Sequence, residues 1–156
     1  MNSSSFQNCL EAALRYFNYR PRSEAEIRKR LKYRGFDNAL VNEVISHLKA
    51  QKLIDDDAFA QFWKDNRQFF RPRSQRLIRL ELKEKGIASE IIDRVTQDID
   101  DEANAYTVGR KSARLLVTSD YKDFCQRLTS YLRRRGFGYE VINHTIMRLW
   151  QELKSL

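Results

Sequence analysis

An internal repeat of about 50 residues organises this chain of 156 residues. The run Arg20-Pro21-Arg22-Ser23 returns 51 residues later as Arg71-Pro72-Arg73-Ser74. The same shift superposes Gly35 on Gly86, and a further shift of 50 residues carries Gly86 to Gly136. Units of this size bury little surface alone, so each copy is expected to pack against its neighbour. We therefore divide the chain into one continuous module of three copies: 1–54, 55–101 and 102–156.

Each copy has the pattern of three helices. In the first copy, Ser23 and Glu26 stand at capping-box spacing, Gly35 follows where a helix would end in a left-handed turn, and Asp37 can cap a third helix. No segment shows the strict alternation that is typical of strands. The expected first helix has apolar residues at i, i+3, i+4 and i+7: Phe6, Cys9, Leu10, Ala13, Leu14 and Phe17. The sequence predicts an all-α fold of three tandem three-helix, helix-turn-helix-like repeats that form an elongated, curved body.

The positive charge gathers on the predicted second helices. Residues 20–35 carry a net +5, residues 71–86 carry +4 and residues 122–136 carry +4, whereas the whole chain carries +8. The rest of the chain is therefore acidic, with a net −5. A face that is basic in every copy would suit a nucleic-acid backbone or an acidic protein surface. A solvated face with local ion pairs is the alternative interpretation.

The third helices do not have the composition of major-groove readers. Residues 37–49 and 89–100 present Asn, Glu and Asp with few cations, and the basic residues lie on the helix before. A helix that reads bases needs cations beside the base-contacting side chains. Sequence-specific operator binding is therefore disfavoured.

We expect neither an enzyme nor a metal or cofactor site. The run Asp55-Asp56-Asp57 is explained by capping of the next helix, because carboxylates accept free N–H groups at a helix start. His47 and His144 have no Ser or carboxylate partner at a recognisable spacing, and no phosphate-binding or zinc-protease motif is present. Cys9 and Cys125 are isolated thiols that indicate no disulfide or zinc site.

Aromatic residues cluster within the second copy. At helical spacing, Phe59, Phe62 and Trp63 are expected in the core. Phe69 and Phe70 lie next to Arg71, and their role stays open between core packing and base stacking. The chain has neither an apolar run of about 18 residues nor a secretory leader, so we expect a cytoplasmic protein with no membrane partner.

Several of these segments together resemble the signature of the RecX family, the regulators of the bacterial RecA recombinase. The resemblance spans residues 6 to 153. Its motifs are Leu53-Ile54-Asp55-Asp56-Asp57-Ala58-Phe59-Ala60, Arg67, Arg71-Pro72-Arg73-Ser74, Leu80-Glu81-Leu82, Lys85-Gly86-Ile87 and the segment from Ser23 to Gly35-Phe36. The third copy departs from the pattern, because residues 117–122 replace the Arg-Pro-Arg-Ser lead-in.

The resemblance implies a modulator that binds in the groove of the RecA filament on single-stranded DNA, and we expect the chain to be a monomer. Such a protein represses strand exchange and ATPase activity and so regulates recombinational repair and the SOS response; double-stranded DNA is a further candidate partner. The alternatives are a DNA- or RNA-binding protein with no recombinase partner and a helical adaptor for an acidic protein. The candidate residues for contact with RecA or DNA are Arg20, Arg22, Arg28, Lys32, Arg34, Arg67, Arg71, Arg73, Arg76, Arg79, Lys83, Lys85, Arg127, Arg133, Arg134 and Arg135.

Overall fold

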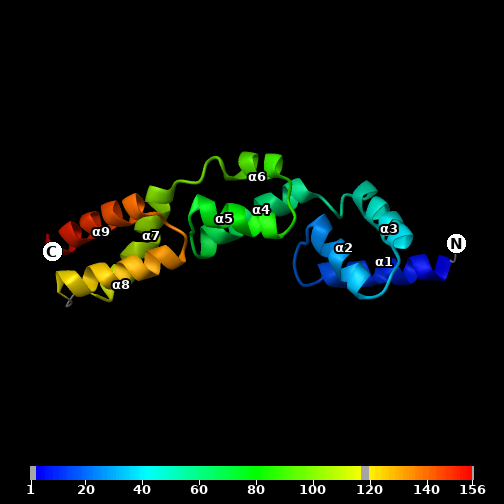
Figure 1. Cartoon of the computed structure of the whole chain (residues 1–156), viewed down its shortest axis with the longest axis horizontal. Helices are drawn as coiled ribbons and strands as arrows, with labels where there is room; N and C mark the ends of the chain where they lie inside the picture. Colours follow the sequence, from blue (N-terminus) through cyan, green and yellow to red (C-terminus); the bar gives the residue numbers. More distant parts are fainter. Residues whose placement is uncertain (1–2, 117–119, 156) are drawn as a thin grey trace. The chain divides into compact units, whose positions relative to one another are not determined.

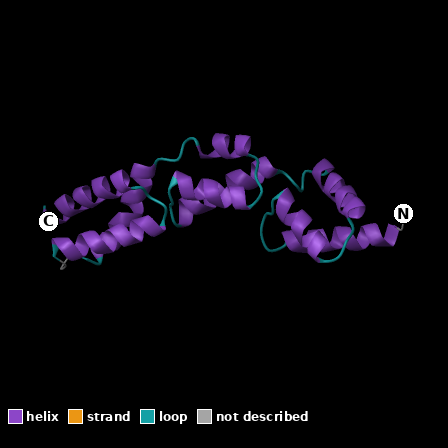
Figure 2. Cartoon of the chain, viewed as in Figure 1, coloured by secondary structure: helices purple, strands orange, loops and turns teal. Residues whose placement is uncertain are grey.

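The computed structural model describes residues 3–116 and 120–155, and within these ranges the chain is helical with no strand (Figure 2). The all-α prediction is confirmed. Residues 117–119, which belong to the unusual lead-in of the third copy, lie outside the described residues. The helices are α1 (Ser3–Phe17), α2 (Glu24–Tyr33), α3 (Asn38–Ala50), α4 (Asp56–Phe70), α5 (Gln75–Glu84), α6 (Ser89–Thr96), α7 (Asp101–Arg114), α8 (Tyr121–Arg134) and α9 (Tyr139–Lys154).

The helices pack as two compact units. Unit 1 contains the chain up to residue 63 together with residues 82–95, and unit 2 contains residues 64–81 and everything from residue 96 onward. The division passes through α4 and α5, so both units include part of the second copy. The packing units thus differ from the three copies, whose boundaries at 54/55 and 101/102 stay a prediction.

In unit 1, helices α1, α2 and α3 contact one another around an apolar core (Figure 1). The helical spacing explains this core, because residues three or four apart lie on one face. The predicted residues Cys9 and Ala13 are fully buried, as are Ile27 and Leu31 on α2, whereas Leu14 lies at the exposed edge of α1. The buried cluster consists of Cys9, Ala12, Ala13, Ile27, Leu31, Leu40, Val41, Val44, Ile45, Leu48 and Ile54.

In unit 2, helices α7, α8 and α9 pack in the same manner (Figure 1). Phe124, Leu128 and Leu132 follow one another along the buried face of α8. Gly109 on α7 lets α9 approach, since a Cβ there would lie 3.1 Å from Leu149 Cδ1. The buried cluster consists of Ala105, Val108, Ala113, Leu116, Phe124, Leu128, Leu132, Phe137, Ile142, Ile146 and Leu149.

The predicted caps are present at the helix starts. Ser23 and Glu26 form a complete capping box: the Ser23 hydroxyl accepts from the Glu26 N–H (3.2 Å), and the Glu26 carboxylate accepts from the Ser23 N–H (3.1 Å). Asp37 accepts from the Leu40 N–H at 2.9 Å. Asp55 accepts from the Ala58 N–H at 3.1 Å, as expected of an acidic run that begins a helix. These local hydrogen bonds fix where the helices begin.

The helix ends agree with the sequence at the repeated glycines and differ at one other place. Gly35, Gly86 and Gly136 have φ of 94°, 78° and 91°, which is the left-handed conformation predicted for them. The third helix of the second copy ends at Thr96, four residues before the predicted Asp100. Asp100 has left the helix because it caps α7, where its carboxylate accepts from the Ala103 N–H.

Candidate binding surface on the second helices

The structure separates the sixteen candidate residues into two groups of eight. One group is exposed, and its members are Lys32, Arg34, Arg71, Arg76, Lys83, Arg127, Arg133 and Arg134. The other group is half-buried, and its members are Arg20, Arg22, Arg28, Arg67, Arg73, Arg79, Lys85 and Arg135. The sequence alone did not indicate this division, because it depends on which cations meet acidic or aromatic residues of other segments.

Glu26 gathers three of the half-buried cations in unit 1. Its carboxylate receives two hydrogen bonds from the Arg20 guanidinium and lies 3.8 Å from Arg22 Nη1 and 3.7 Å from Lys85 Nζ. Burial acts to raise the pKa of Glu26, but the hydrogen bonds from Arg20 and the Ser23 N–H and the charge of Lys85 outweigh it and hold the pKa below its ordinary value. Glu26 is therefore an ionised carboxylate that holds three basic side chains in place.

We expect Glu26→Gln to lower the free energy of unfolding at neutral pH by about 2 kcal/mol, because it leaves partly buried arginines without their carboxylate. The lowered pKa of Glu26 means that the folded chain holds the ionised form more strongly than the unfolded chain does. This stabilisation is complete above the ordinary glutamate pKa of about 4.3 and is lost as the pH falls through the lower folded value. Urea unfolding of both proteins from pH 7 to pH 3 should show the difference shrinking, and a constant difference would contradict this role.

Glu81 plays a similar part in unit 2. Its carboxylate lies 3.3 Å from Arg67 Nε and 2.5 Å from Arg73 Nη1, and its side chain is 15% exposed. Arg79 donates to the Thr96 hydroxyl at 3.1 Å. In unit 1, Arg28 pairs with Glu24 within α2, with Nε 3.0 Å from the carboxylate, and it reaches α3 by donating from Nη1 to the Asn42 side-chain carbonyl at 2.7 Å. These arginines hold helices together. An external partner would have to compete with the hydrogen bonds and ion pairs that they already make.

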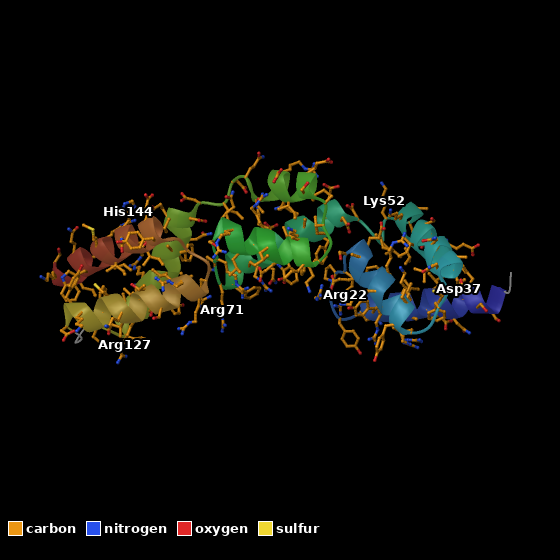
Figure 3. All side chains as sticks on the ribbon, in the orientation of Figure 1. Arg22, Asp37, Lys52, Arg71, Arg127 and His144 are labelled. Carbon is orange, nitrogen blue, oxygen red and sulfur yellow. The ribbon has the colours of Figure 1, made fainter. Side chains whose placement is uncertain are left out.

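The outward cations recur at one position of the repeat. Lys32, Lys83 and Arg133 are equivalent under the repeat shifts and are exposed near the ends of α2, α5 and α8. Within the residues that the structure describes, none of the three side chains has a hydrogen-bond or ion-pair partner. In unit 2, Figure 3 shows Arg71 and Arg127 projecting from one edge and His144 on the opposite edge. The cations available to a partner are thus concentrated on the second helices.

The aromatic residues of α4 divide between core and surface. Phe59 is buried as predicted, whereas Phe62 is 37% exposed, so its predicted place in the core is wrong. At about 100° per residue, Phe62 is rotated further from the Phe59 direction than Trp63 is. Trp63 is half-buried, with Arg20 and Lys85 at 5.5 and 5.2 Å from its ring centroid.

The two aromatic residues whose role stayed open are on the surface. Phe69 is 81% exposed and Phe70 is 68% exposed, and their ring centroids lie 5.0 Å apart in an edge-to-face pair. Both precede the exposed Arg71 at the end of α4. An exposed aromatic pair beside a cation is an arrangement that stacks on unpaired bases.

Each unit contains a junction that sequence reasoning missed. In unit 1, Gly86 at the end of α5 meets Ala25 at the beginning of α2, and the Ser23 hydroxyl donates to the Lys85 carbonyl at 2.6 Å. A cavity of about 800 Å³ beside this junction brings together the candidates Arg20, Lys32 and Lys85. It is also lined by residues that were not candidates, among them Tyr16, Lys29, Arg30 and Tyr33.

Unit 2 repeats this junction one copy later. Gly136 at the end of α8 meets the beginning of α5, where a Cβ on the glycine would lie 2.7 Å from Leu77 Cβ. The Ser74 N–H donates to the Arg135 carbonyl at 3.1 Å. The glycines are therefore required for the turn and also for close packing between copies. The need for the turn can be read from one copy alone, but the need for close packing cannot.

Three further findings concern features other than the basic surface. Among residues 3–116 and 120–155, no group of three or more His, Cys, Asp or Glu side chains is placed to hold a metal ion. No helix in this part of the chain has the length and apolarity needed to cross a membrane. His144 lies 3.0 Å from Glu102 in an exposed pair.

Comparison with known proteins extends over nearly the whole chain. Models of the first, second and third three-helix domains of RecX match residues 9–48, 55–95 and 100–146. The regulatory protein RecX of Chlorobium limicola is 32% identical over 139 residues, which cover 89% of this chain and 87% of that protein. The regulatory protein RecX of Chlorobaculum tepidum is 31% identical over 94% of this chain and 91% of its own length.

A solved structure shows the same fold. The crystal structure of RecX from Lactobacillus salivarius matches 95% of this chain and 98% of its own, with a TM-score of 0.78 and 22% identity. The prediction of three tandem three-helix domains is confirmed by these matches together with the observed helices of the chain. With three consecutive domain models matched and relatives above 30% identity along most of its length, the chain belongs to the RecX family.

Proposed function

We propose that this protein is a non-enzymatic inhibitor of the RecA recombinase that binds in the groove of the RecA filament on single-stranded DNA. The observation that carries the proposal is the recurrence, at one position of α2, α5 and α8, of exposed cations that have no side-chain partner among the described residues, namely Lys32, Lys83 and Arg133. Membership of a family of regulatory proteins supports a role in regulation. A cytoplasmic location follows from that role.

The repeated cations favour a repeating anionic partner. Phosphates recur along a nucleic-acid strand, and lysine or arginine contacts with them release counterions and strengthen binding at low salt. Three contacts made by one chain also reinforce one another, because the second and third form within an already bound complex. A nucleoprotein filament offers such a partner, and a protein seated in its groove would obstruct strand exchange and ATP turnover.

Co-sedimentation with RecA filaments assembled on single-stranded DNA tests the proposal. We expect the protein to pellet with the filament more tightly than with naked DNA of the same length, and to lower the rates of strand exchange and ATP hydrolysis. Equal binding to filament and naked DNA, with no change in either rate, would refute recombinase regulation. That result would favour a nucleic-acid-binding protein without a recombinase partner.

A further inference from the structure

A basic cavity lies beside the junction between α8 and α5 in unit 2. Its volume is about 250 Å³, and it is lined by Arg73, Leu77, Tyr131, Arg134 and Arg135. Cavities that hold drug-sized molecules usually start at about 300 Å³, so this one suits a single small group. Three arginines around so small a space favour an anion.

The equivalent junction in unit 1 carries its own anion. There Glu26 occupies the third position of α2, accepts from the Ser23 N–H and lies 3.7 Å from the Lys85 ammonium group. The equivalent position in α5 is Leu77, which has no carboxylate. The junction in unit 2 therefore has a cation, Arg135, at the position of Lys85. It lacks a carboxylate at the position of Glu26, which balances Lys85 in unit 1.

The side chain of Arg135 shows the effect of having Leu77 where unit 1 has Glu26. Its Nε atom is buried and is the one buried side-chain nitrogen or oxygen without a hydrogen-bond partner in the described part of the chain. Its guanidinium carbon lies 4.7 Å from the centroid of the Tyr131 ring, which accounts for the position of the group and leaves Nε–H without an acceptor. A buried donor left without an acceptor costs free energy that a bound anion would restore.

The other two arginines add to the imbalance. Arg73 is partly neutralised by Glu81, whose carboxylate lies 2.5 Å from Nη1. Arg134 is exposed and has no side-chain partner among the described residues. One carboxylate thus faces three guanidinium groups, which leaves the cavity positively charged.

We propose that this cavity binds one phosphate group of a single-stranded nucleic-acid backbone. Guanidinium groups match the paired oxygens of a phosphodiester, and the Arg135 guanidinium that lines the cavity is held in place against the Tyr131 ring. The exposed rings of Phe69 and Phe70 lie a few residues before Arg73 in the sequence and suit the bases that accompany such a phosphate. The proposal rests on the proposed function for the DNA that supplies the phosphate.

Leu77→Glu tests the site by restoring the acid that unit 1 has. We expect the variant to stay folded and to bind a short single-stranded oligodeoxynucleotide about tenfold more weakly, because its own carboxylate occupies the cavity. Leu80→Glu is the matched control: Leu80 lies on the same helix, is exposed and does not line the cavity, and the charge change is the same. Equal affinities of the two variants would overturn the proposal.

The Arg135 Nε–H signal in a nitrogen-detected NMR titration reports on occupancy directly. With the wild-type chain we expect it to move on addition of inorganic phosphate and of the oligonucleotide, and with Leu77→Glu to respond to neither. A signal that moves only when RecA filament is added would overturn the assignment to phosphate in favour of a carboxylate of the recombinase. The proposed function fails separately, if the wild-type signal responds to the oligonucleotide while the protein leaves RecA activity unchanged.

Discussion

Replacing Gly86 with alanine is expected to lower the free energy of unfolding by about 3 to 4 kcal/mol, against about 1 to 2 kcal/mol for Gly35→Ala. Both glycines lie in unit 1 and have a positive φ, so both variants bear the strain of a left-handed alanine. A Cβ on Gly86 would overlap the Cβ of Ala25, whereas a Cβ on Gly35 meets nothing within 4 Å. The difference between the variants therefore isolates the packing of α5 against α2.

Urea unfolding followed by circular dichroism measures both values. Shortening the obstructing side chain provides the control, since Gly86→Ala combined with Ala25→Gly should recover part of the loss. If Gly35→Ala and Gly86→Ala were equally destabilising, the close contact would contribute nothing beyond the turn.

The largest effect on DNA binding is expected from two exposed cations, one in the segment that leads into α5 and one in the first turn of α5. Arg71 and Arg76 are both exposed and have no side-chain partner among the described residues. Changing both to glutamate lowers the net charge from +8 to +4. We expect affinity for single-stranded DNA to fall more than tenfold, and the slope of log affinity against log salt to become shallower by about 1.4.

Lys111 and Arg114 supply the matched control for this double variant. They lie on α7 in the same unit, are also exposed, and changing both to glutamate alters the net charge by the same amount. Fluorescence anisotropy over a series of salt concentrations measures both variants. Equal losses in the two would mean that overall charge, and not the second-helix surface, governs binding.

The helices could be predicted from the sequence because their determinants are close together in it. The capping box joins Ser23 to Glu26, and the apolar face of α2 is set by Ile27 and Leu31. Each of these pairs lies within one turn of helix. The left-handed glycines were predictable for the same reason, because a helix end is a local event.

The division of the candidate cations could not be predicted in this way. Arg67 meets Glu81 across two helices, and Lys85 reaches Glu26 from a different copy of the repeat. Such pairs depend on how the helices pack, and the basic pattern in the sequence is the same whether a cation faces inward or outward. The cavity at Arg135 was hidden for the same reason, since Leu77 is an ordinary apolar residue until its counterpart Glu26 is seen in contact with Lys85.

The junction between copies also has an evolutionary consequence. The second copy carries both halves of the joint: Gly86 docks on the first copy, and Ser74 receives the third. A gene duplication that inserts such a copy brings a complete interface with it, so the array can lengthen without new complementary mutations. The third copy keeps Gly136 but has buried Phe124 in place of the serine. Lengthening beyond it would require that half of the joint to evolve again.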